Sequence, residues 1–200
     1  MTEFIPFPRD FYEPSAQAVA PALLGHWLVR NTGRGPAGGA IVETEAYLAD
    51  DPACHAAPGM TPRNRVMFGP PGHGYVYFIY GCHFCVNAVC RPAGVGEAVL
   101  IRAVEPLFGL EWMRRCRSVR HERDLASGPG KLCQALQIDR TLDGVDFCAS
   151  TSALFIACNS RVRLFRNRYG PVVITKRIGI SRAAHLPLRF YLGKSSAVSG

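Results

Sequence analysis

The segment Gly39–Leu48 constrains the fold most strongly, because its side chains alternate with a period of two, which predicts a β-strand. One face is small or apolar and suits a core: Val42, Thr44, Ala46 and Leu48. The other face suits a reactive surface: Ile41, Glu43, Glu45 and Tyr47. An edge strand with two solvated glutamates is the alternative, and this segment alone leaves both interpretations open.

The length of 200 residues is enough for one domain with a substantial core. We therefore expect a single domain over residues 1–200, with an extended, proline-broken arm at 1–14 and a flexible tail at 193–200. A hydrophobic content of 48% and a charged content of 19% are typical of a globular chain.

Short strand and helix patterns alternate along the rest of the chain. Residues 75–80 and 84–89 predict a β-hairpin that turns at Gly81-Cys82-His83. Further strands are expected at 26–30, 98–104, 153–158, 161–165 and 172–175, and helices after Ser15, from Pro106 and at 132–138. This order favours an α+β fold with a largely antiparallel sheet.

The net charge of +8 comes mostly from arginine, since only three of the 23 basic residues are lysines. Arginine binds phosphate bidentately and stacks on planar groups, which suits nucleic acid. An anionic membrane surface or an acidic protein partner would also suit such a charge. Charge therefore indicates a class of partner without selecting one.

The eight cysteines do not indicate a secreted disulfide scaffold. The first eight residues lack a signal-peptide pattern, and no run is apolar enough to span a bilayer, so we expect an intracellular chain with reduced thiols. Cys82-His83-Phe84-Cys85 superficially resembles a metal site, but a second Cys-x-x-Cys pair is missing from the sequence. A zinc or iron–sulfur protein stays the less favoured alternative, and we expect neither metal nor cofactor.

Arg102 lies among apolar residues of a predicted strand and therefore needs a carboxylate partner or a wet pocket. We predict that it pairs with Glu43 or Glu45; a pair with Glu105, or solvent, is the alternative. A carboxylate paired in this way stays ionised near neutral pH and can act as a general base.

Four of the seven tyrosines lie on the two strands that flank a polar loop containing His55: Tyr47, Tyr75, Tyr77 and Tyr80. Aromatic rings around a carboxylate suit a flat, electron-poor ligand such as a damaged base. Core packing of the tyrosines and a backbone-bonded His55 are the alternatives. Tyr80 precedes Gly81 at a hairpin tip, where an exposed ring could open a base step.

One loop could contact a DNA phosphate, and a second loop carries two cations. The segment 127–131, Ser-Gly-Pro-Gly-Lys, leads into a helix and could hold one phosphate on backbone N–H groups, although its spacing is not that of a Walker A loop. The segment 61–65 carries two further cations, Arg63 and Arg65. The arginines between 114 and 120 suit a solvated helix face as well as a docking face.

Taken together, these residues resemble the alkyladenine (3-methyladenine, or methylpurine) DNA glycosylases from about residue 11 to residue 192. The resemblance rests on spaced blocks, which makes it highly specific: Ile41–Leu48, Thr61–Arg65, Met67-Phe68, Tyr75–Tyr77, Tyr80-Gly81, Cys85–Asn87, Leu100–Ala103, Gly128–Leu132 and Pro187–Tyr191. It implies one compact domain around a curved antiparallel sheet flanked by helices.

The resemblance also implies a monofunctional enzyme that flips an alkylated or deaminated purine out of duplex DNA and hydrolyses its N-glycosidic bond, which initiates base excision repair. The purines of this class are 3-methyladenine, 7-methylguanine, hypoxanthine and ethenoadenine. By position, Glu45 would activate water and Arg102 would help to place it. The remaining roles implied are base stacking by Tyr47 and Tyr77 opposite His55, guanine exclusion by Asn87, a backbone contact at Ile178, intercalation by Tyr80, and backbone contacts by Arg63 and Lys131.

The expected partner is double-stranded DNA that contains a damaged purine. We expect the protein to be a monomer that does not bind a membrane. The expected location is the cytoplasm or nucleoid, or the nucleus in a eukaryote. Two departures from the family pattern, Ala49 and Cys82, concern substrate preference. A non-catalytic nucleic-acid-binding module that stacks bases on tyrosine is the alternative function.

Overall fold

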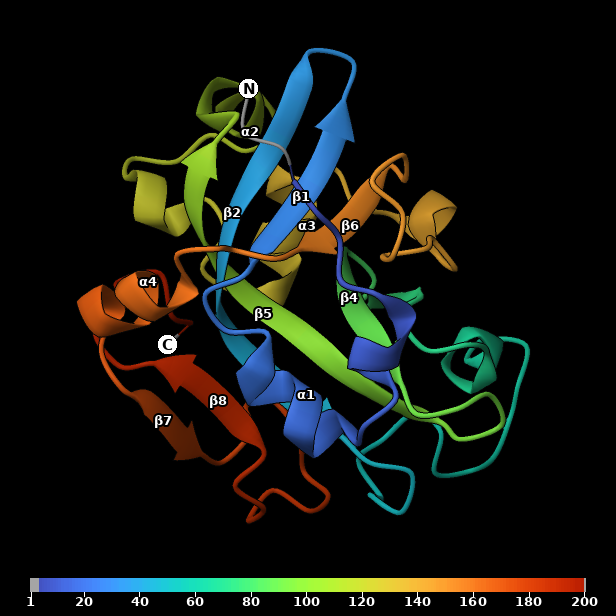
Figure 1. Ribbon diagram of the computed structural model, residues 1–200. Coiled ribbons are helices and arrows are strands. Elements are labelled where there is room, and N and C mark those ends of the chain that lie inside the picture. The colour runs from blue at the N-terminus through green and yellow to red at the C-terminus, as the bar shows by residue number, and fades with distance from the viewer. Residues whose placement is uncertain (1–3, 200) are drawn as a thin grey trace.

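The chain folds around one curved sheet whose named strands all pair in antiparallel fashion (Figure 1). The computed structural model describes residues 4–199. Its strands are β1 (Trp27–Thr32), β2 (Gly35–Tyr47), β3 (Gly74–Ile79), β4 (His83–Cys90), β5 (Glu97–Phe108), β6 (Leu154–Ala157), β7 (Val172–Thr175) and β8 (Arg189–Leu192). The main order is β3-β4-β5-β2-β1-β6, and β8 pairs with both β2 and β7. The predicted α+β fold with a largely antiparallel sheet is confirmed.

Strand β2 is the centre of this sheet. It pairs with β5 along one side, while its first half pairs with β1 and its second half with β8 on the other. Gly38 and Gly39 lie where the strands approach most closely, because an added Cβ would come within 2.0 Å of the Leu28 carbonyl oxygen and 1.8 Å of the Glu105 carbonyl oxygen. The two glutamates therefore lie in the middle of the molecule, and the edge-strand alternative is wrong.

Alternation along β5 separates the main core from a smaller apolar cluster. Val99, Ile101 and Ala103 point into the main core, whereas Ala98 and Leu100 join the second cluster with Tyr75 and Tyr77. Arg102 has the parity of Leu100 and thus lies on the side of the second cluster. The sheet consequently has one packed face and one face that carries polar groups.

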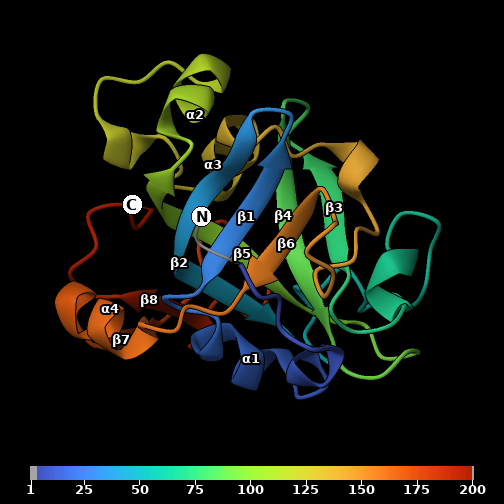
Figure 2. The same cartoon turned by 45° about the horizontal axis from the view of Figure 1, so that its top comes forward.

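Four α-helices flank the sheet: α1 (Ala16–Ala22), α2 (Leu110–Cys116), α3 (Pro129–Ala135) and α4 (Val162–Tyr169). Helix α1 packs against β2 and β5, and α3 packs against β4 and β5. Figure 2 shows α1 and α3 separated along the sheet, with α1 nearer to β8. Helices α1, α2 and α3 each contribute buried residues to the main core.

Two predicted elements are wrong. Pro106 does not begin a helix, because β5 continues to Phe108 through its pairing with β2, and α2 begins only after Gly109, whose φ is 66°. Residues 162–165 form the first part of α4 and not a strand, with Arg161 as the N-cap of the helix. Val162 and Phe165 are three residues apart, and both side chains lie next to Gly25 on one side of the helix. The helical spacing of these apolar residues therefore outweighs the local alternation that predicted a strand.

The two ends of the chain behave differently from each other. Residues 4–8 of the predicted arm are extended, with a bridge between Pro6 and Ala157, and Arg9–Tyr12 form a 3-10 turn; residues 1–3 lie outside the described part. Residues 193–199, which were predicted to form a flexible tail, instead pack against the rest of the protein. Ala197 is fully buried, and the backbone N–H of Ser199 donates to a buried carboxylate oxygen of Glu43 at 2.7 Å. This end of the chain packs against β2 because it supplies hydrogen bonds to that buried charge.

Within residues 4–199, none of the helices has both the length and the apolar character needed to cross a membrane.

Candidate active site

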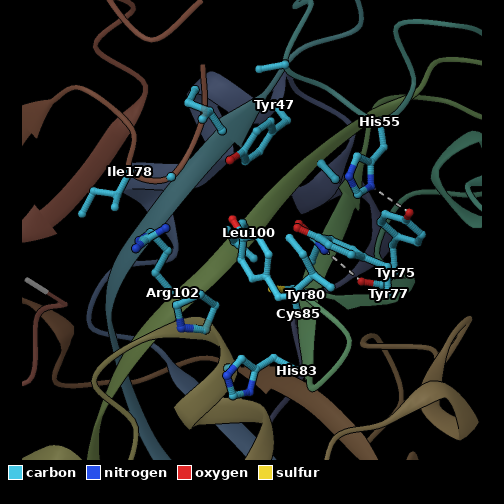
Figure 3. A pocket seen from close by; sticks show the side chains of 18 of the residues that line it. Tyr47, His55, Tyr75, Tyr77, Tyr80, His83, Cys85, Leu100, Arg102 and Ile178 are labelled. Carbon is cyan, nitrogen blue, oxygen red and sulfur yellow. Dashed lines mark hydrogen bonds between the residues drawn. The ribbon is translucent and has the colours of Figure 1, made fainter. Parts of the chain in front are cut away.

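A cavity of about 400 Å³ opens on the polar face of the sheet, between β2, β5, the β3–β4 hairpin and the loop after β7 (Figure 3). Seven of the predicted site residues line it: Tyr47, His55, Tyr77, Tyr80, Asn87, Arg102 and Ile178. These residues are up to 131 positions apart in the sequence (47 to 178). Tertiary folding therefore brings the dispersed motifs to one place.

Glu45 lies immediately behind the cavity wall and is fully buried. Its Oε1 accepts from the backbone N–H of Ile178 at 2.8 Å and lies 3.2 Å from Nη1 of Arg102. Its Oε2 accepts from the Tyr47 hydroxyl at 2.9 Å. All three partners are cavity-lining residues, so a molecule in the cavity can reach this carboxylate only through the space between them.

Glu43 lies on the same face of β2, two residues earlier, and is also fully buried. Arg102 contacts both carboxylates: its Nε donates to Oε1 of Glu43 at 2.9 Å, and its Nη1 faces Glu45. The predicted pairing of Arg102 is thus confirmed, with two partners in place of one. The alternative partner, Glu105, instead accepts a hydrogen bond from Ser195.

The electrostatics of this cluster keep Arg102 charged and Tyr47 protonated. Burial disfavours the Arg102 cation, but the charges of Glu45 and Glu43 outweigh burial, so the pKa of Arg102 is raised. Burial, and then the charge and hydrogen bond of Glu45, raise the pKa of the Tyr47 phenol. Tyr47 therefore donates to Glu45 at neutral pH.

The aromatic side chains form two walls. His55 and Tyr77 meet edge to face with ring centroids 4.4 Å apart, and Nδ1 of His55 lies 3.0 Å from the Tyr75 hydroxyl. Figure 3 shows Tyr47 across the cavity from these rings. The expectation that His55 faces Tyr77 across a base is therefore wrong, because at 4.4 Å a ring cannot enter between them. The slot lies between Tyr47 and the wall made by His55 and Tyr77.

His55 is held in its neutral form. Burial, followed by the nearby charge of Arg63, lowers the pKa of His55 below its ordinary value. Arg63 itself lies 5.9 Å above the Tyr77 ring and donates to the Phe78 carbonyl. A neutral imidazole can present one nitrogen as a donor and the other as an acceptor.

Tyr80 lies at the tip of the β3–β4 hairpin and is 76% exposed. The N–H of Cys82 donates to the Ile79 carbonyl at 3.3 Å, and the two central residues of this turn, Tyr80 and Gly81, have φ of 54° and 70°. Two positive φ values are those of a type I′ turn, in which asparagine or glycine normally occupies the position of Tyr80. A large, exposed ring is thus held in an unfavourable backbone conformation, which is frequent at functional sites.

Asn87 and Ile178 also line the cavity. Asn87 is buried and its amide nitrogen donates to the Tyr75 carbonyl at 3.0 Å, which fixes its orientation. Ile178 contributes its backbone N–H to Glu45. The preceding residue, Arg177, anchors this segment, since its guanidinium lies 4.6 Å from the Tyr47 ring centroid and pairs with the buried carboxylate of Asp51.

The two predicted backbone-contacting cations lie outside the cavity. Arg63 lines a second cavity of about 530 Å³ that shares His55 and Tyr75 with the first. Lys131 lies in the first turn of α3, with Nζ 3.3 Å from the Ser127 hydroxyl, and its neighbours Pro129 and Gly130 line the first cavity.

Sequence reasoning missed several residues around this site. Arg177 could have been found, because it directly precedes Ile178, and Arg189 belongs to the block at 187–191. Ser199 carries no local signal, since it follows a polar segment that is typical of a flexible tail. Its role depends on a contact with Glu43, which is 156 residues away.

Comparison with known proteins agrees with this geometry. The family model described as methylpurine-DNA glycosylase matches residues 10–196. The chain belongs to this family. Family members are DNA glycosylases that act in DNA repair, and the family implies a hydrolase that acts on N-glycosyl bonds in a DNA substrate.

Similar proteins occur in bacteria and archaea. A protein of Carboxydothermus hydrogenoformans is 47% identical over 96% of this chain and 97% of its own length, and one of Methanoculleus marisnigri is 49% identical over the same shares. A protein of Koribacter versatilis is 44% identical over 100% of this chain and 96% of its own length. All three are named "Putative 3-methyladenine DNA glycosylase".

All eight cysteines are free thiols, and Cys82 and Cys85 lie on the hairpin, one exposed and one buried. Burial raises the pKa of the Cys85 thiol. Within residues 4–199, histidine, cysteine, aspartate and glutamate side chains do not gather in groups of three or more that could hold a metal ion.

Proposed function

We propose that this chain is a monofunctional DNA glycosylase that flips alkylated or deaminated purines out of duplex DNA and hydrolyses their N-glycosidic bond. The substrates are of the 3-methyladenine, 7-methylguanine, hypoxanthine and ethenoadenine class. The observation that carries the proposal is the position of Glu45, a fully buried carboxylate held by two hydrogen-bond donors and the Arg102 guanidinium at the back of an aromatic-lined cavity. The cavity volume of about 400 Å³ lies in the range of small-molecule sites.

The base binds between Tyr47 on one side and Tyr77 with His55 on the other. Electron-rich phenol rings stabilise a cationic alkylated purine by cation–π attraction and a neutral purine by stacking. Asn87 crowds the exocyclic amine of undamaged guanine and so discourages its entry. Tyr80, exposed at the hairpin tip, fills the gap that the flipped nucleotide leaves in the duplex.

For a cationic methylated purine, the chemistry requires a base for water and little else. A water molecule in the space between Tyr47, Arg102 and Ile178 gives a proton to Glu45 as its oxygen attacks C1′ of the sugar, and the bond from C1′ to the purine breaks. The methylated purine takes up the bonding electrons and leaves as a neutral base. Arg102, charged and buried, orients Glu45 and the water. The product is an abasic site, and the proposed route uses neither a lysine nucleophile nor a metal.

The DNA backbone lies along the basic rim of the cavity. Lys131 and the N-terminal turn of α3 contact one phosphate, and Arg63 contacts another near His55. We take residues 1–200 as one glycosylase domain that acts as a monomer on double-stranded DNA.

The decisive experiment compares the wild-type chain with Glu45→Gln on duplexes that each carry one of the four lesions, scored for free base and alkali-labile sites. We expect Glu45→Gln to bind the damaged duplex with wild-type affinity while base release is nearly abolished. Glu105→Gln is a matched control on β5, outside the cavity wall, and should release base at the wild-type rate. Binding by the wild-type chain without base release from any lesion would instead support a non-catalytic module.

A further inference from the structure

We propose that Glu43, Arg189 and Ser199 are positioning residues for Arg102, so that the segment 193–199 completes the active site. This inference rests on the proposed function, because it concerns how the guanidinium beside Glu45 is held. It assigns a task to three buried or half-buried polar residues that the catalytic steps above leave unused.

Glu43 is saturated by donors from three parts of the chain. Its Oε1 accepts from Nε of Arg102 at 2.9 Å, from Nε of Arg189 at 2.6 Å and from the Ser199 hydroxyl at 2.8 Å. Its Oε2 accepts from the backbone N–H of Ser199 at 2.7 Å. A carboxylate with four such donors is rigidly placed, because any displacement breaks several charge-assisted hydrogen bonds.

The guanidinium of Arg102 is divided among three acceptors. Nε donates to Glu43, Nη1 faces Glu45 at 3.2 Å, and Nη2 lies 3.0 Å from the Ser199 hydroxyl oxygen. Within residues 4–199, that hydroxyl is the one hydrogen-bond partner that the structure gives Nη2. The Ser199 hydroxyl therefore fixes the rotation of the fork that presents Nη1 to Glu45.

The charges of this cluster balance. Two buried carboxylates, Glu43 and Glu45, face two guanidiniums, Arg102 and Arg189, and the side chains of all four are at most 12% exposed. Buried ion pairs contribute little net stability, since desolvation offsets their attraction. A cluster of this kind is better explained by the geometry that it imposes on the site than by the free energy of folding.

The same segment contains a matched control. The Ser195 hydroxyl donates to Oε2 of Glu105 at 3.0 Å, which also ties the 193–199 segment to the sheet through a serine and a glutamate. This second tie does not touch Arg102. Ser195→Ala therefore reports what is lost when the segment is loosened without any change at the guanidinium.

The test measures single-turnover base release, affinity for a duplex with an abasic analogue, and thermal stability for Ser199→Ala, Ser199→Thr and Ser195→Ala. We expect Ser199→Ala to lower the cleavage rate about ten- to a hundredfold, which corresponds to one lost hydrogen bond to a charged group, with unchanged affinity. Ser199→Thr keeps the hydroxyl and should restore most of the rate. Ser195→Ala should cleave at the wild-type rate.

A double-mutant cycle separates positioning from general stability. If Ser199 acts through Arg102, Ser199→Ala causes little further loss of rate in the Arg102→Ala background. A wild-type rate for Ser199→Ala, an equal loss in Ser195→Ala, or an additive loss in the double mutant would each overturn the inference. Failure of the proposed function would look different, because the wild-type chain would then release no base or Glu45→Gln would release it at the wild-type rate.

Discussion

At the hairpin tip we expect Tyr80 to lower the stability of the fold while it strengthens the proposed binding of DNA. The substitution Tyr80→Asn tests both effects separately. Tyr80 occupies the first central position of a turn with φ of 54°, where a side chain other than glycine costs about 1–2 kcal/mol and asparagine costs less. The ring is 76% exposed, so its removal sacrifices little buried apolar surface. We therefore expect Tyr80→Asn to increase the free energy of unfolding by about 1 kcal/mol.

For a chain of 200 residues, a gain of this size raises the melting temperature by about 2–4 °C. The same substitution removes the ring that we propose fills the gap in the duplex. Base–aromatic stacking contributes about 1–3 kcal/mol, so the affinity for a duplex with an abasic analogue should fall by about fivefold or more. The protein would thus become more stable and bind more weakly.

Denaturant unfolding and calorimetry measure the first effect, and a fluorescence-anisotropy titration with the abasic duplex measures the second. Tyr80→Phe is the matched control, because it keeps both the ring and the unfavourable backbone conformation and should match the wild type in both assays. A destabilised Tyr80→Asn would refute the strained-turn argument. Unchanged affinity in that variant would refute the role of the ring in DNA capture.

Three further predictions concern other positions. Burial, and then the charge of Arg166, lower the pKa of His26 to about 4, so the unfolded chain binds a proton on this side chain at a higher pH than the folded chain does. We therefore expect the free energy of unfolding to fall by about 3 kcal/mol between pH 6.5 and pH 4. In denaturant titrations, His26→Asn should remove this pH dependence. Asn87→Ser should raise the release of undamaged guanine relative to that of hypoxanthine, measured as free base from matched duplexes; an unchanged ratio would remove Asn87 from the specificity filter. Arg177→Leu leaves the buried Asp51 carboxylate unpaired and should lower the free energy of unfolding by about 3–5 kcal/mol, whereas a loss below 1 kcal/mol in urea unfolding would show that the pair is dispensable.

Local pattern was sufficient for the elements that carry the site. The two-residue period of 39–48 placed Glu43, Glu45 and Tyr47 on one face of a strand, and the β-prone run ending at Tyr80-Gly81 indicated the hairpin. Both signals lie within a few residues of the side chains concerned. They can therefore be recognised without knowledge of the rest of the chain.

Local pattern failed where long-range pairing competes with it. Pro106 is a good first residue for a helix, yet the pairing of β5 with the bulged part of β2 extends the strand past it. The alternation in 161–165 yields to a helix because Val162 and Phe165 pack on one side of α4. In both cases tertiary contacts contribute more than local preference.

By itself, the sequence determined the sheet face, the hairpin tip, the class of aromatic pocket and, through its spaced blocks, the family to which the chain belongs. Only the tertiary structure decided that Arg102 bridges both glutamates, that His55 lies beside Tyr77, and that Ser199 closes over Glu43. The physical reason is that periodicity reports which way a side chain points, whereas its partner depends on strand register and on loops that return from more than a hundred residues away.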